Sequence, residues 1–402
     1  MAPRKDKLVA VIGTDFDRSY AGTLHLLESL AAEFDVEAYV FTDVGRGGWY
    51  ARRPFACRAF PLRGSAWDGG RLKLMSKLFR VFVGLRMLFA RRVLITETAY
   101  LREAALAKKI KGRRQVLVQF CQELALPEEY PHDRWPRTQK RWARVPDVVI
   151  DVDPLRAAAR AEYYGLRQLP FVLRNTVAQS QLPARAPAGG LWALAGRAPP
   201  PPGLPVLVHA GGVVREKPFE RIIDAVAALP EPVFLLAFCS ASAAEIQRLR
   251  DYAADKLPAD RFHLHPAVAR DALRASWWEA DVGVVDYAFS VEPTLNQKFC
   301  APTKLYEFMA CGLAVLGSDN ESLRVVVEGE GIGVCARGDA PADLARALGE
   351  LLRQDLPVLK ARARAAFKAR YSYEAACADE VRRIAAEMRR LERGGPNGGA
   401  PE

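Results

Sequence analysis

Residues 302–316 read Pro302-Thr303-Lys304-Leu305-Tyr306-Glu307-Phe308-Met309-Ala310-Cys311-Gly312-Leu313-Ala314-Val315-Leu316. This pattern predicts a short helix that begins at Pro302 and ends at Gly312, followed by an apolar strand. Lys304 and Glu307 are three residues apart, so they share one face of the helix. Such a pair is often a solvated ion pair. However, a helix N-terminus beside a lysine attracts phosphate, and a carboxylate one turn further accepts hydrogen bonds from a sugar diol. Together these features indicate a nucleotide site.

The same segment resembles the nucleotide-sugar site of retaining GT-B glycosyltransferases of the family-4 type. Their signature is a P-x-K-x-x-E-x-x-A-x-G-x-P-V-like run. The resemblance implies that Glu307 binds the donor ribose, while Lys304 and the helix end at Thr303 contact the diphosphate. Two positions depart from the signature: Ala314 replaces a common proline, and Phe299 stands where many members carry a second glutamate. The resemblance therefore covers the nucleotide end of the site better than the sugar end.

The composition is that of a globular protein with an anionic partner. The chain has 402 residues, of which 50% are hydrophobic and 26% charged, and its formal net charge is +11. This length predicts two domains or one large one, and the positive charge favours nucleic acid, lipid headgroups or a phosphorylated substrate. The seven cysteines are scattered without a C-x-x-C pair. We therefore expect free thiols rather than a disulfide framework or a structural zinc site.

Neither a membrane span nor a signal peptide is expected. No apolar run reaches the roughly 18 residues that a spanning helix needs. The charged residues 1–7 lead directly into a strand-like stretch at 8–12, which leaves no room for the apolar region of a signal peptide. We therefore expect a cytoplasmic protein.

Strand-like and helical stretches alternate along the chain, which predicts βαβ units with parallel sheets. The predicted strands are 7–13, 36–41, 93–96, 115–120, 148–152 and 171–173, then 204–210, 233–238, 262–264, 282–285, 313–316 and 333–334. We expect an α/β protein with two doubly wound Rossmann-like domains facing a cleft, which is the GT-B plan. Its predicted parts are an acceptor-side domain at 1–177, a linker at 178–204, a nucleotide-sugar domain at 205–370, a C-terminal helix at 371–392 that packs back on the first domain, and a disordered tail at 393–402.

Residues 208–219 predict a strand, a glycine turn and a helix start, a combination that lets backbone approach a ligand closely. This region resembles the first donor-domain loop of the family, commonly G-R-x-x-x-x-K-G. Gly211 and Lys217 match that pattern, Gly212 stands at the arginine position, and Arg215 is a candidate replacement. By resemblance, Lys217 contacts the donor diphosphate. The alternative is an ordinary turn with a solvated lysine.

Polar residues follow other predicted strands. Asn296 lies in the loop before the signature helix and resembles an asparagine of relatives that have a P-x-K helix. In the first domain, Asp15, Asp17, Gly22 and Thr23 follow the opening strand, where ligands bind in parallel sheets. By resemblance they form the acceptor-side loop, in which an aspartate holds an acceptor hydroxyl. Turn stabilisation is the alternative role for Asn296 and for both aspartates.

Glu123 is the candidate closest to the reacting centre. The sequence Gln122-Glu123-Leu124 follows a predicted strand and resembles the H/Q-E-L element of the family, in which a polar residue reaches the donor sugar. The alternative is a surface glutamate.

No metal site is expected. The Asp151-Val152-Asp153 run looks like a D-x-D metal motif, but Pro154 follows it, so N-capping by Asp153 is the simpler interpretation. His263 and His265 share a strand face and lack an evident third ligand.

The positive charge has one clear local source. Between Arg71 and Arg92 the chain has seven Lys or Arg residues and no acid. On a helical wheel Lys73, Lys77, Arg80 and Arg91 form one stripe among apolar residues, an arrangement suited to an anionic membrane interface. A core-packed helix with a solvated basic edge is the alternative. Nucleic acid is not expected, because no stacking platform accompanies the charge.

These observations predict a glycosyltransferase that moves a sugar from a nucleotide-sugar donor to an acceptor hydroxyl. The acceptor would be a glycan, a lipid-linked sugar or a small molecule. The resemblance implies retention of configuration, independence of metal ions and of any cofactor, and a role in glycan, glycolipid or cell-surface polysaccharide synthesis. The protein would work in the cytoplasm, at the inner face of the membrane. Two alternatives stay open: a catalytically idle GT-B-like subunit that binds a partner enzyme or membrane, and a nucleotide-sugar epimerase of the same fold.

Overall fold

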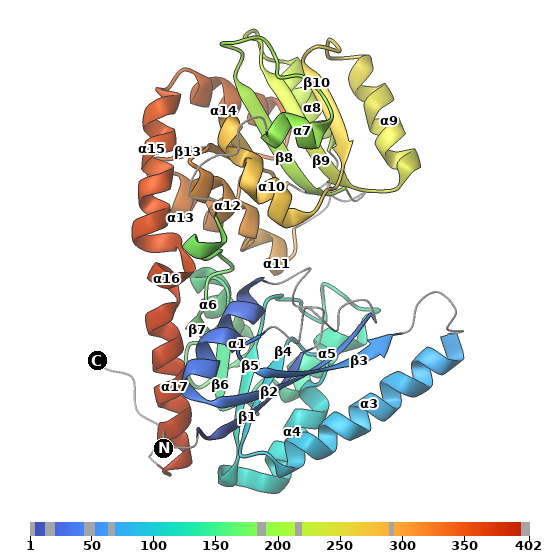
Figure 1. The fold of residues 1–402 in the computed structure, drawn as a ribbon, viewed down its shortest axis with the longest axis vertical. Coiled ribbons are helices and arrows are strands. Elements are labelled where there is room, and N and C mark those ends of the chain that lie inside the picture. Colours follow the sequence, from blue (N-terminus) through green and yellow to red (C-terminus); the bar gives the residue numbers. More distant parts are fainter. Residues whose placement is uncertain are drawn as a thin grey trace. The chain divides into compact units, whose positions relative to one another are not determined.

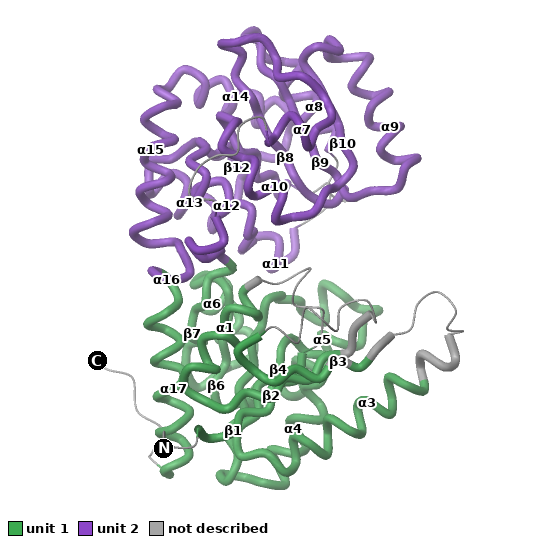
Figure 2. Tube along the Cα trace, viewed as in Figure 1, with its two compact units in different colours: residues 1–175, 376–402 green, residues 176–375 purple. Residues whose placement is uncertain are grey.

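The computed structural model describes residues 5–12, 21–43, 53–62, 69–182, 190–213, 219–288 and 293–394. The chain folds into two compact units (Figure 2). Unit 1 comprises residues 1–175 and 376–402, and unit 2 comprises residues 176–375. Each unit contains one parallel sheet with helices on its faces (Figure 1). The predicted pair of doubly wound Rossmann-like domains is confirmed.

The sheet of unit 1 has seven parallel strands in the order β3-β2-β1-β4-β5-β6-β7. They are β1 (Lys7–Ile12), β2 (Asp35–Asp43), β3 (Ala56–Leu62), β4 (Arg92–Thr96), β5 (Val116–Phe120), β6 (Val148–Asp151) and β7 (Phe171–Val172). The strand order reverses between β1 and β4, so the crevice that binds ligands in such sheets lies at their carboxyl ends. Strand β3 is not among the predicted strands, because Arg58 and Pro61 interrupt its apolar pattern.

Helices cover both faces of this sheet. They are α1 (Ala21–Glu33), α3 (Gly69–Phe89), α4 (Leu101–Lys111) with the short η2 (Gly112–Arg114), α5 (Arg134–Trp142), α6 (Pro154–Tyr164) and α17 (Ala378–Glu392). Helices α3, α4 and α5 lie in a row over one face, while α1 and α17 pack together over the other (Figure 1). Among the described residues, no helix has the length and apolar character needed to cross a membrane.

The sheet of unit 2 has six parallel strands in the order β10-β9-β8-β11-β12-β13. They are β8 (Val206–Gly212), β9 (Phe234–Ser240), β10 (Phe262–Pro266), β11 (Val282–Val285), β12 (Ala314–Gly317) and β13 (Gly333–Cys335). Its helices are α7 (Gly190–Ala195), α8 (Glu220–Ala227), α9 (Ala243–Ala254), α10 (Arg270–Ser276), α11 (Leu295–Lys298), α12 (Thr303–Cys311), α13 (Glu321–Val327), α14 (Pro341–Leu352), α15 (Leu356–Ala366) and the short α16 (Tyr373–Ala376). Here the order reverses between β8 and β11.

The sheet of unit 2 has one hydrophobic core on each face, because successive strand residues point to opposite faces. In β8, Val206 and Val208 pack against α7, α10 and α12, while Leu207 packs against α8, α9 and α14. Strand β11 has Gly283 on the α12 side. A Cβ at this position would lie 2.3 Å from the Phe308 ring, so the glycine allows α12 to pack closely on the sheet.

The segment expected to link the domains is partly folded into unit 2. Within residues 178–204, α7 places Leu191 and Trp192 in the core next to Phe234. At the other end of unit 2 the chain returns to unit 1, where α17 buries Val381 and Met388 against the sheet.

Candidate functional site

Helix α12 has the bounds that the sequence predicts and begins at the carboxyl edge of the sheet of unit 2 (Figure 1). Pro302 is its N-cap and makes no side-chain cap, so a ligand can complete this end of the helix. Gly312 ends the helix with φ 70°, a conformation that suits glycine. Strand β12 follows directly, which confirms the predicted helix and strand.

Glu307 is held by two arginines of α10. The Nε atoms of Arg270 and Arg274 both donate to Glu307 Oε1, at 2.9 and 3.2 Å. Glu307 is buried, with 5% of its surface exposed, so this pairing compensates the cost of burying a carboxylate. Arg274 also donates to Gln181 Oε1. In the described part of the chain, all hydrogen bonds to Glu307 end on Oε1, which leaves Oε2 for another donor.

The ammonium group of Lys304 lies at the position in the sheet of unit 2 where the strand order reverses. Its Nζ lies 5.5 Å from the centre of the Tyr287 ring, which follows β11. A Cβ on Gly211, near the end of β8, would lie 3.1 Å from the same Nζ. Glycine at this position therefore lets the ammonium lie against the strand end. The structure thus brings together Lys304, Gly211 and the first turn of α12, whereas Glu307 pairs with α10 rather than with Lys304.

The remaining residues predicted for unit 2 lie in different surroundings. Gly211 and Gly212 are the last residues of β8 and continue its pairing with β9, so they belong to the strand rather than to the expected turn. Arg215 and Lys217 lie outside the described residues. Asn296 lies on α11, a short helix closed at its start by reciprocal hydrogen bonds between Thr294 and Gln297.

In unit 1 the structure brings Thr23 and Gln122 together. Thr23 Oγ1 lies 3.4 Å from Gln122 Oε1, at the start of α1. Gln122 is 3% exposed, and its Nε2 has no hydrogen-bond partner among the described residues. A Cβ on Gly22 would lie 3.8 Å from this Nε2. The α1 N-terminus and Gln122 therefore share one end of the sheet. Asp15 and Asp17 precede α1 outside the described residues.

Glu123 follows Gln122 and is partly buried. Its backbone carbonyl accepts a hydrogen bond from Arg160 Nη2 at 2.7 Å, and the carbonyl of Gln122 accepts from Arg156 Nη1. Both arginines come from α6, so this helix holds the segment after β5 by its backbone. The glutamate predicted from the sequence thus lies on an anchored segment at the carboxyl edge of the sheet.

Sequence reasoning missed three charged residues of these sites. Arg270 and Arg274 are four residues apart on α10, a spacing that places both on one helix face, but no motif marks them. Glu97 directly follows β4 and has a buried carboxyl whose pKa is raised to about 8, mainly by burial and then by the charge of Glu123. Its position after a predicted strand was a signal that could have identified it.

The D-x-D run is structural. Asp153 Oδ1 accepts hydrogen bonds from the N–H groups of Leu155 and Arg156, at 2.9 and 3.2 Å, which confirms the predicted N-cap of α6. Asp151 is fully buried and pairs with Arg160 at 2.6 Å. His263 binds the Ala195 carbonyl, and the described residues contain no group of three metal-binding side chains.

The basic stripe predicted on residues 71–92 is only partly solvent-exposed. Lys77 and Arg91 are exposed, but Arg80 turns inward to Glu103 and the Ala99 carbonyl on the α4 side. The side chain of Lys73 lies outside the described residues. Apolar side chains along α3, in contrast, face solvent, including Leu78 at 54% and Phe89 at 79% exposure. This helix is therefore more apolar on its outer face than the sequence predicts.

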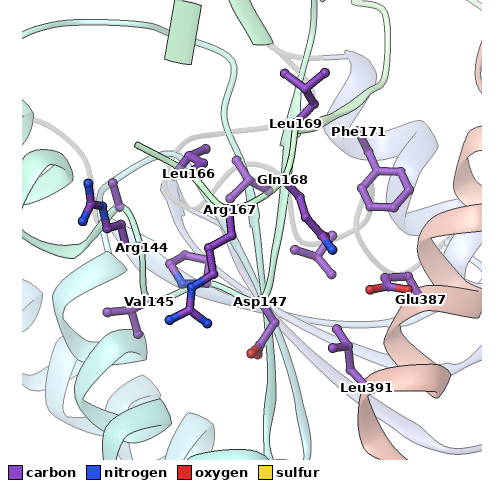
Figure 3. A pocket seen from close by; sticks show the side chains of 14 residues that line it. Arg144, Val145, Asp147, Leu166, Arg167, Gln168, Leu169, Phe171, Glu387 and Leu391 are labelled. Atoms are coloured by element: carbon purple, nitrogen blue, oxygen red, sulfur yellow. The ribbon is translucent and has the colours of Figure 1, made fainter. Parts of the chain in front are cut away.

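One pocket of about 230 Å³ lies in unit 1, between the loops that lead into β6 and β7 and the end of α17 (Figure 3). It lies at the amino ends of the strands, opposite the edge that carries Gln122 and Glu123. Three of its charged groups have partners within the protein: Arg144 donates to the Tyr164 carbonyl, Asp147 pairs with Lys108, and Glu387 pairs with Arg390. This pocket therefore has no evident link to the candidate sites.

Comparison with known proteins links the candidate site of unit 2 to one family model. Residues 204–354 match the family model of the glycosyl transferases group 1. No curated protein sequence matches the chain. Solved structures are similar over nearly the whole length at low identity. HepE from Anabaena, in complex with UDP, is 16% identical with a TM-score of 0.71, covering 96% of this chain and 99% of that chain.

Two further structures have the same architecture. Sucrose-phosphate synthase from Thermosynechococcus elongatus is 16% identical with a TM-score of 0.71, covering 97% of this chain and all of that chain. A putative UDP-N-acetylglucosamine 2-epimerase from Listeria monocytogenes is 15% identical with a TM-score of 0.62, covering 98% of both chains. The chain therefore has the GT-B fold, its residues 204–354 match the group 1 glycosyl transferases, and the resemblance to GT-B glycosyltransferases in its sequence is confirmed.

Proposed function

We propose that this protein transfers a sugar from a nucleotide-sugar donor to an acceptor hydroxyl. The observation that carries the proposal is the arrangement around α12, in the segment that matches the family model. Lys304, Gly211 and the first turn of α12 converge where the strand order reverses, and Glu307 lies one turn further along the helix. HepE has been solved in complex with UDP and with UDP-glucose. Uridine nucleotides are therefore the first ligands to test.

In this proposal the donor nucleotide binds at the carboxyl edge of the sheet of unit 2. Negative charge accumulates on the diphosphate as the glycosidic bond breaks, so cations placed beforehand stabilise the transition state. Lys304 and the α12 N-terminus at Thr303 supply that charge, together with Lys217 and Arg215. Glu307 Oε2 accepts a ribose hydroxyl, while Arg270 and Arg274 hold the opposite carboxylate oxygen in place.

The residues of unit 1 are proposed to act on the sugar and the acceptor. The buried side-chain amide of Gln122 donates a hydrogen bond to a hydroxyl, and Glu123 orients the sugar or the acceptor. Asp15, Asp17 and the α1 N-terminus at Gly22 and Thr23 serve the acceptor side. We further propose retention of configuration and a reaction that needs no metal ion, because Lys304 and the α12 N-terminus supply the positive charge. The acceptor is proposed to belong to glycan, glycolipid or cell-surface polysaccharide synthesis.

Donor hydrolysis and UDP binding test the central proposal. Wild type is incubated with a panel of nucleotide sugars, and UDP affinity is measured by calorimetry beside Glu307→Ala. We expect hydrolysis of at least one donor, and a loss of UDP affinity of about tenfold or more in the variant, because a buried hydrogen bond to a charged group is removed. Glu321→Ala, at an exposed position of α13, is the matched control. Unchanged UDP affinity in Glu307→Ala would contradict the proposal.

The alternatives give different results in the same experiment. An idle subunit would bind a nucleotide or a partner without consuming any donor. An epimerase would change the configuration of the sugar, and the putative epimerase from Listeria monocytogenes has a similar fold. Analysis of the sugar product by NMR distinguishes an epimer from a hydrolysed or transferred sugar. The convergence of Lys304, Gly211 and α12 alone fits all three, so product analysis decides.

We also propose that unit 1 binds an anionic membrane through the outer faces of α3 and α4. Exposed large apolar side chains are concentrated on these two helices. They are Leu74, Leu78, Val81, Phe82, Leu85 and Phe89 on α3 and Leu106 and Ile110 on α4, eight of the eleven such side chains found among the described residues. Lys77, Arg91, Arg113 and Arg114 are exposed on α3, on η2 and just after α3. Apolar side chains flanked by cations are typical of an interfacial helix.

Charge favours a lipid surface over a second copy of the chain. Residues 69–142 contain 17 Lys or Arg and six Asp or Glu, so their balance of +11 equals that of the whole chain. Two copies meeting through this surface would bring like charges together, whereas the cytoplasmic leaflet is negatively charged. We therefore propose a cytoplasmic protein that works at the inner face of the membrane.

Vesicle sedimentation tests this surface. Wild type should pellet with vesicles that contain phosphatidylglycerol and much less with pure phosphatidylcholine, and added salt should weaken the binding. The Leu78→Asp/Leu85→Asp variant should remain in the supernatant. Leu169→Asp, at a position of unit 1 that is also exposed (70%) but lies off this surface, should bind like wild type. Dimerisation of the wild type that Leu78→Asp/Leu85→Asp abolishes would instead assign the surface to a second copy.

A further inference from the structure

The backbone of Glu97 is held in an unfavourable conformation. Its φ of 56° is the only positive value of a non-glycine residue in the described part of the chain. Such a conformation costs of the order of 1 kcal/mol and persists only where the surroundings impose it. Here the Glu97 N–H donates to the Phe120 carbonyl at 2.8 Å, and its carbonyl accepts from Gln119 Nε2 at 3.1 Å. Gln119 is in turn bound to Gln139.

This conformation directs the Glu97 carboxyl to the segment after β5. Its Oε1 accepts a hydrogen bond from the Gln122 N–H at 2.7 Å. Glu97 therefore binds the backbone of the residue that directly precedes Glu123, from the neighbouring strand end. The link connects the ends of β4 and β5, next to the point where the strand order of unit 1 reverses.

The surroundings of Glu97 favour its neutral form. The charged and titratable groups that face it are Glu123 and Cys121 after β5, Asp151 at the end of β6 and Arg160 on α6. Burial raises the pKa of the Cys121 thiol to about 12, so this thiol stays neutral. Arg160 pairs with Asp151 and donates to the Glu123 carbonyl, and no described cation forms an ion pair with Glu97. Burial and the charge of Glu123 raise the pKa of Glu97 to about 8.

We propose that Glu97 is a positioning residue for the reaction: its carboxyl holds the Gln122–Glu123 segment through the Gln122 N–H and so fixes the position of Glu123. This proposal rests on the proposed function, which assigns Gln122 and Glu123 to the sugar and the acceptor. When Glu97 loses its proton, two carboxylates lie close together and repel each other. The position of Glu123, and with it the reaction rate, should then change with pH.

Two substitutions distinguish the effect of the Glu97 proton from the effect of the carboxyl group itself. Glu97→Gln keeps an acceptor for the Gln122 N–H and cannot ionise. Glu97→Gly removes the carboxyl, while its backbone suits a φ of 56°, so the protein should still fold. The pH dependence of kcat/KM is measured with the donor that the wild type uses. In the wild type kcat/KM should fall above about pH 8, and in Glu97→Gln it should not fall. Glu97→Gly should lose about 100-fold in kcat at pH 7, because a displaced group near the chemistry costs that much, with UDP affinity unchanged.

Measurements without turnover keep this test separate from the proposed function. Hydrogen exchange of residues 119–126 should accelerate in Glu97→Gly and stay as in wild type in Glu97→Gln. Infrared difference spectra of Glu97→Gln against wild type should show the loss of one protonated carboxyl at pH 7. Absence of that band, an alkaline fall that persists in Glu97→Gln, or unchanged exchange in Glu97→Gly would each overturn the role of Glu97. A wild type without donor turnover would overturn the proposed function, while exchange and infrared spectra still decide the state of Glu97.

Discussion

At the scale of the residue, the two arginines on Glu307 should differ in their contribution to stability. The side chain of Arg274 is 6% exposed, whereas that of Arg270 is 35% exposed. Removing a partner from a buried charge is costly, so Arg274→Ala should lower the free energy of unfolding by about 3 kcal/mol. Arg270→Ala should lower it by about 1 kcal/mol, because water screens the exposed pair. Urea unfolding followed by circular dichroism measures both, and equal losses would contradict this ranking.

Glu97 should make stability depend on pH at the same scale. Its pKa is about 8 in the folded protein, against an ordinary value of 4.5. The folded state therefore binds the proton more tightly, so the contribution is complete below about pH 4.5 and is lost as the pH rises to about 8. Glu97→Gln does not titrate. The melting temperature of this variant, relative to wild type, should thus rise between pH 5 and pH 8 and level off above. A difference independent of pH would show that the carboxyl is ionised throughout.

At the scale of the element, the position of α12 depends on Gly283 of β11. A Cβ at this position would lie 2.3 Å from the ring of Phe308, so Gly283→Ala must displace the helix or the strand. We expect a loss of about 1–3 kcal/mol in stability, as for other overpacked cores, and weaker UDP binding. Differential scanning calorimetry and UDP titration measure the two effects.

Gly84→Ala is the matched control for this substitution. Gly84 lies inside α3, and a Cβ there meets no atom within 4 Å. Alanine should therefore stabilise the protein by up to about 1 kcal/mol through its helix propensity. If Gly283→Ala and Gly84→Ala changed the stability by the same amount, close packing at Gly283 would not be the cause of the loss.

At the scale of the whole molecule, unit 1 is completed by a segment that follows unit 2 in the chain. Helix α17 buries Met388 and Ile384, and Arg389 and Arg92 lie over the ring of Phe34, 5.1 and 5.2 Å from its centre. Met388→Ala should destabilise unit 1 by about 2–5 kcal/mol. Hydrogen exchange should accelerate in β5 and β6 and stay unchanged in β8 to β13. Arg382→Ala, at an exposed position of α17, serves as control, and acceleration in both units would contradict an effect confined to unit 1.

The sequence was sufficient for the fold and for the helix and strand within residues 302–316. Alternating apolar strands and amphipathic helices are local patterns, so they predict two parallel α/β sheets without knowledge of contacts. Residues 302–316 likewise contain their own helix start, helix stop and strand. Strand β3 was not predicted, because Arg58 and Pro61 interrupt its apolar pattern. Helix α7 was not predicted, because its small residues resemble those of a linker.

Only the tertiary structure decided which charges meet. Arg270 and Arg274 lie more than 30 residues before Glu307, and Glu97 lies 25 residues before Gln122, so no local pattern joins them. The pairing of Arg80 with Glu103 on α4 likewise depends on which helices pack together. The segment from Pro302 to Leu316 thus determined the kind of ligand to expect. Packing alone determined how Glu307 is held and what raises the pKa of Glu97, because ion pairing and desolvation act between segments distant in the sequence.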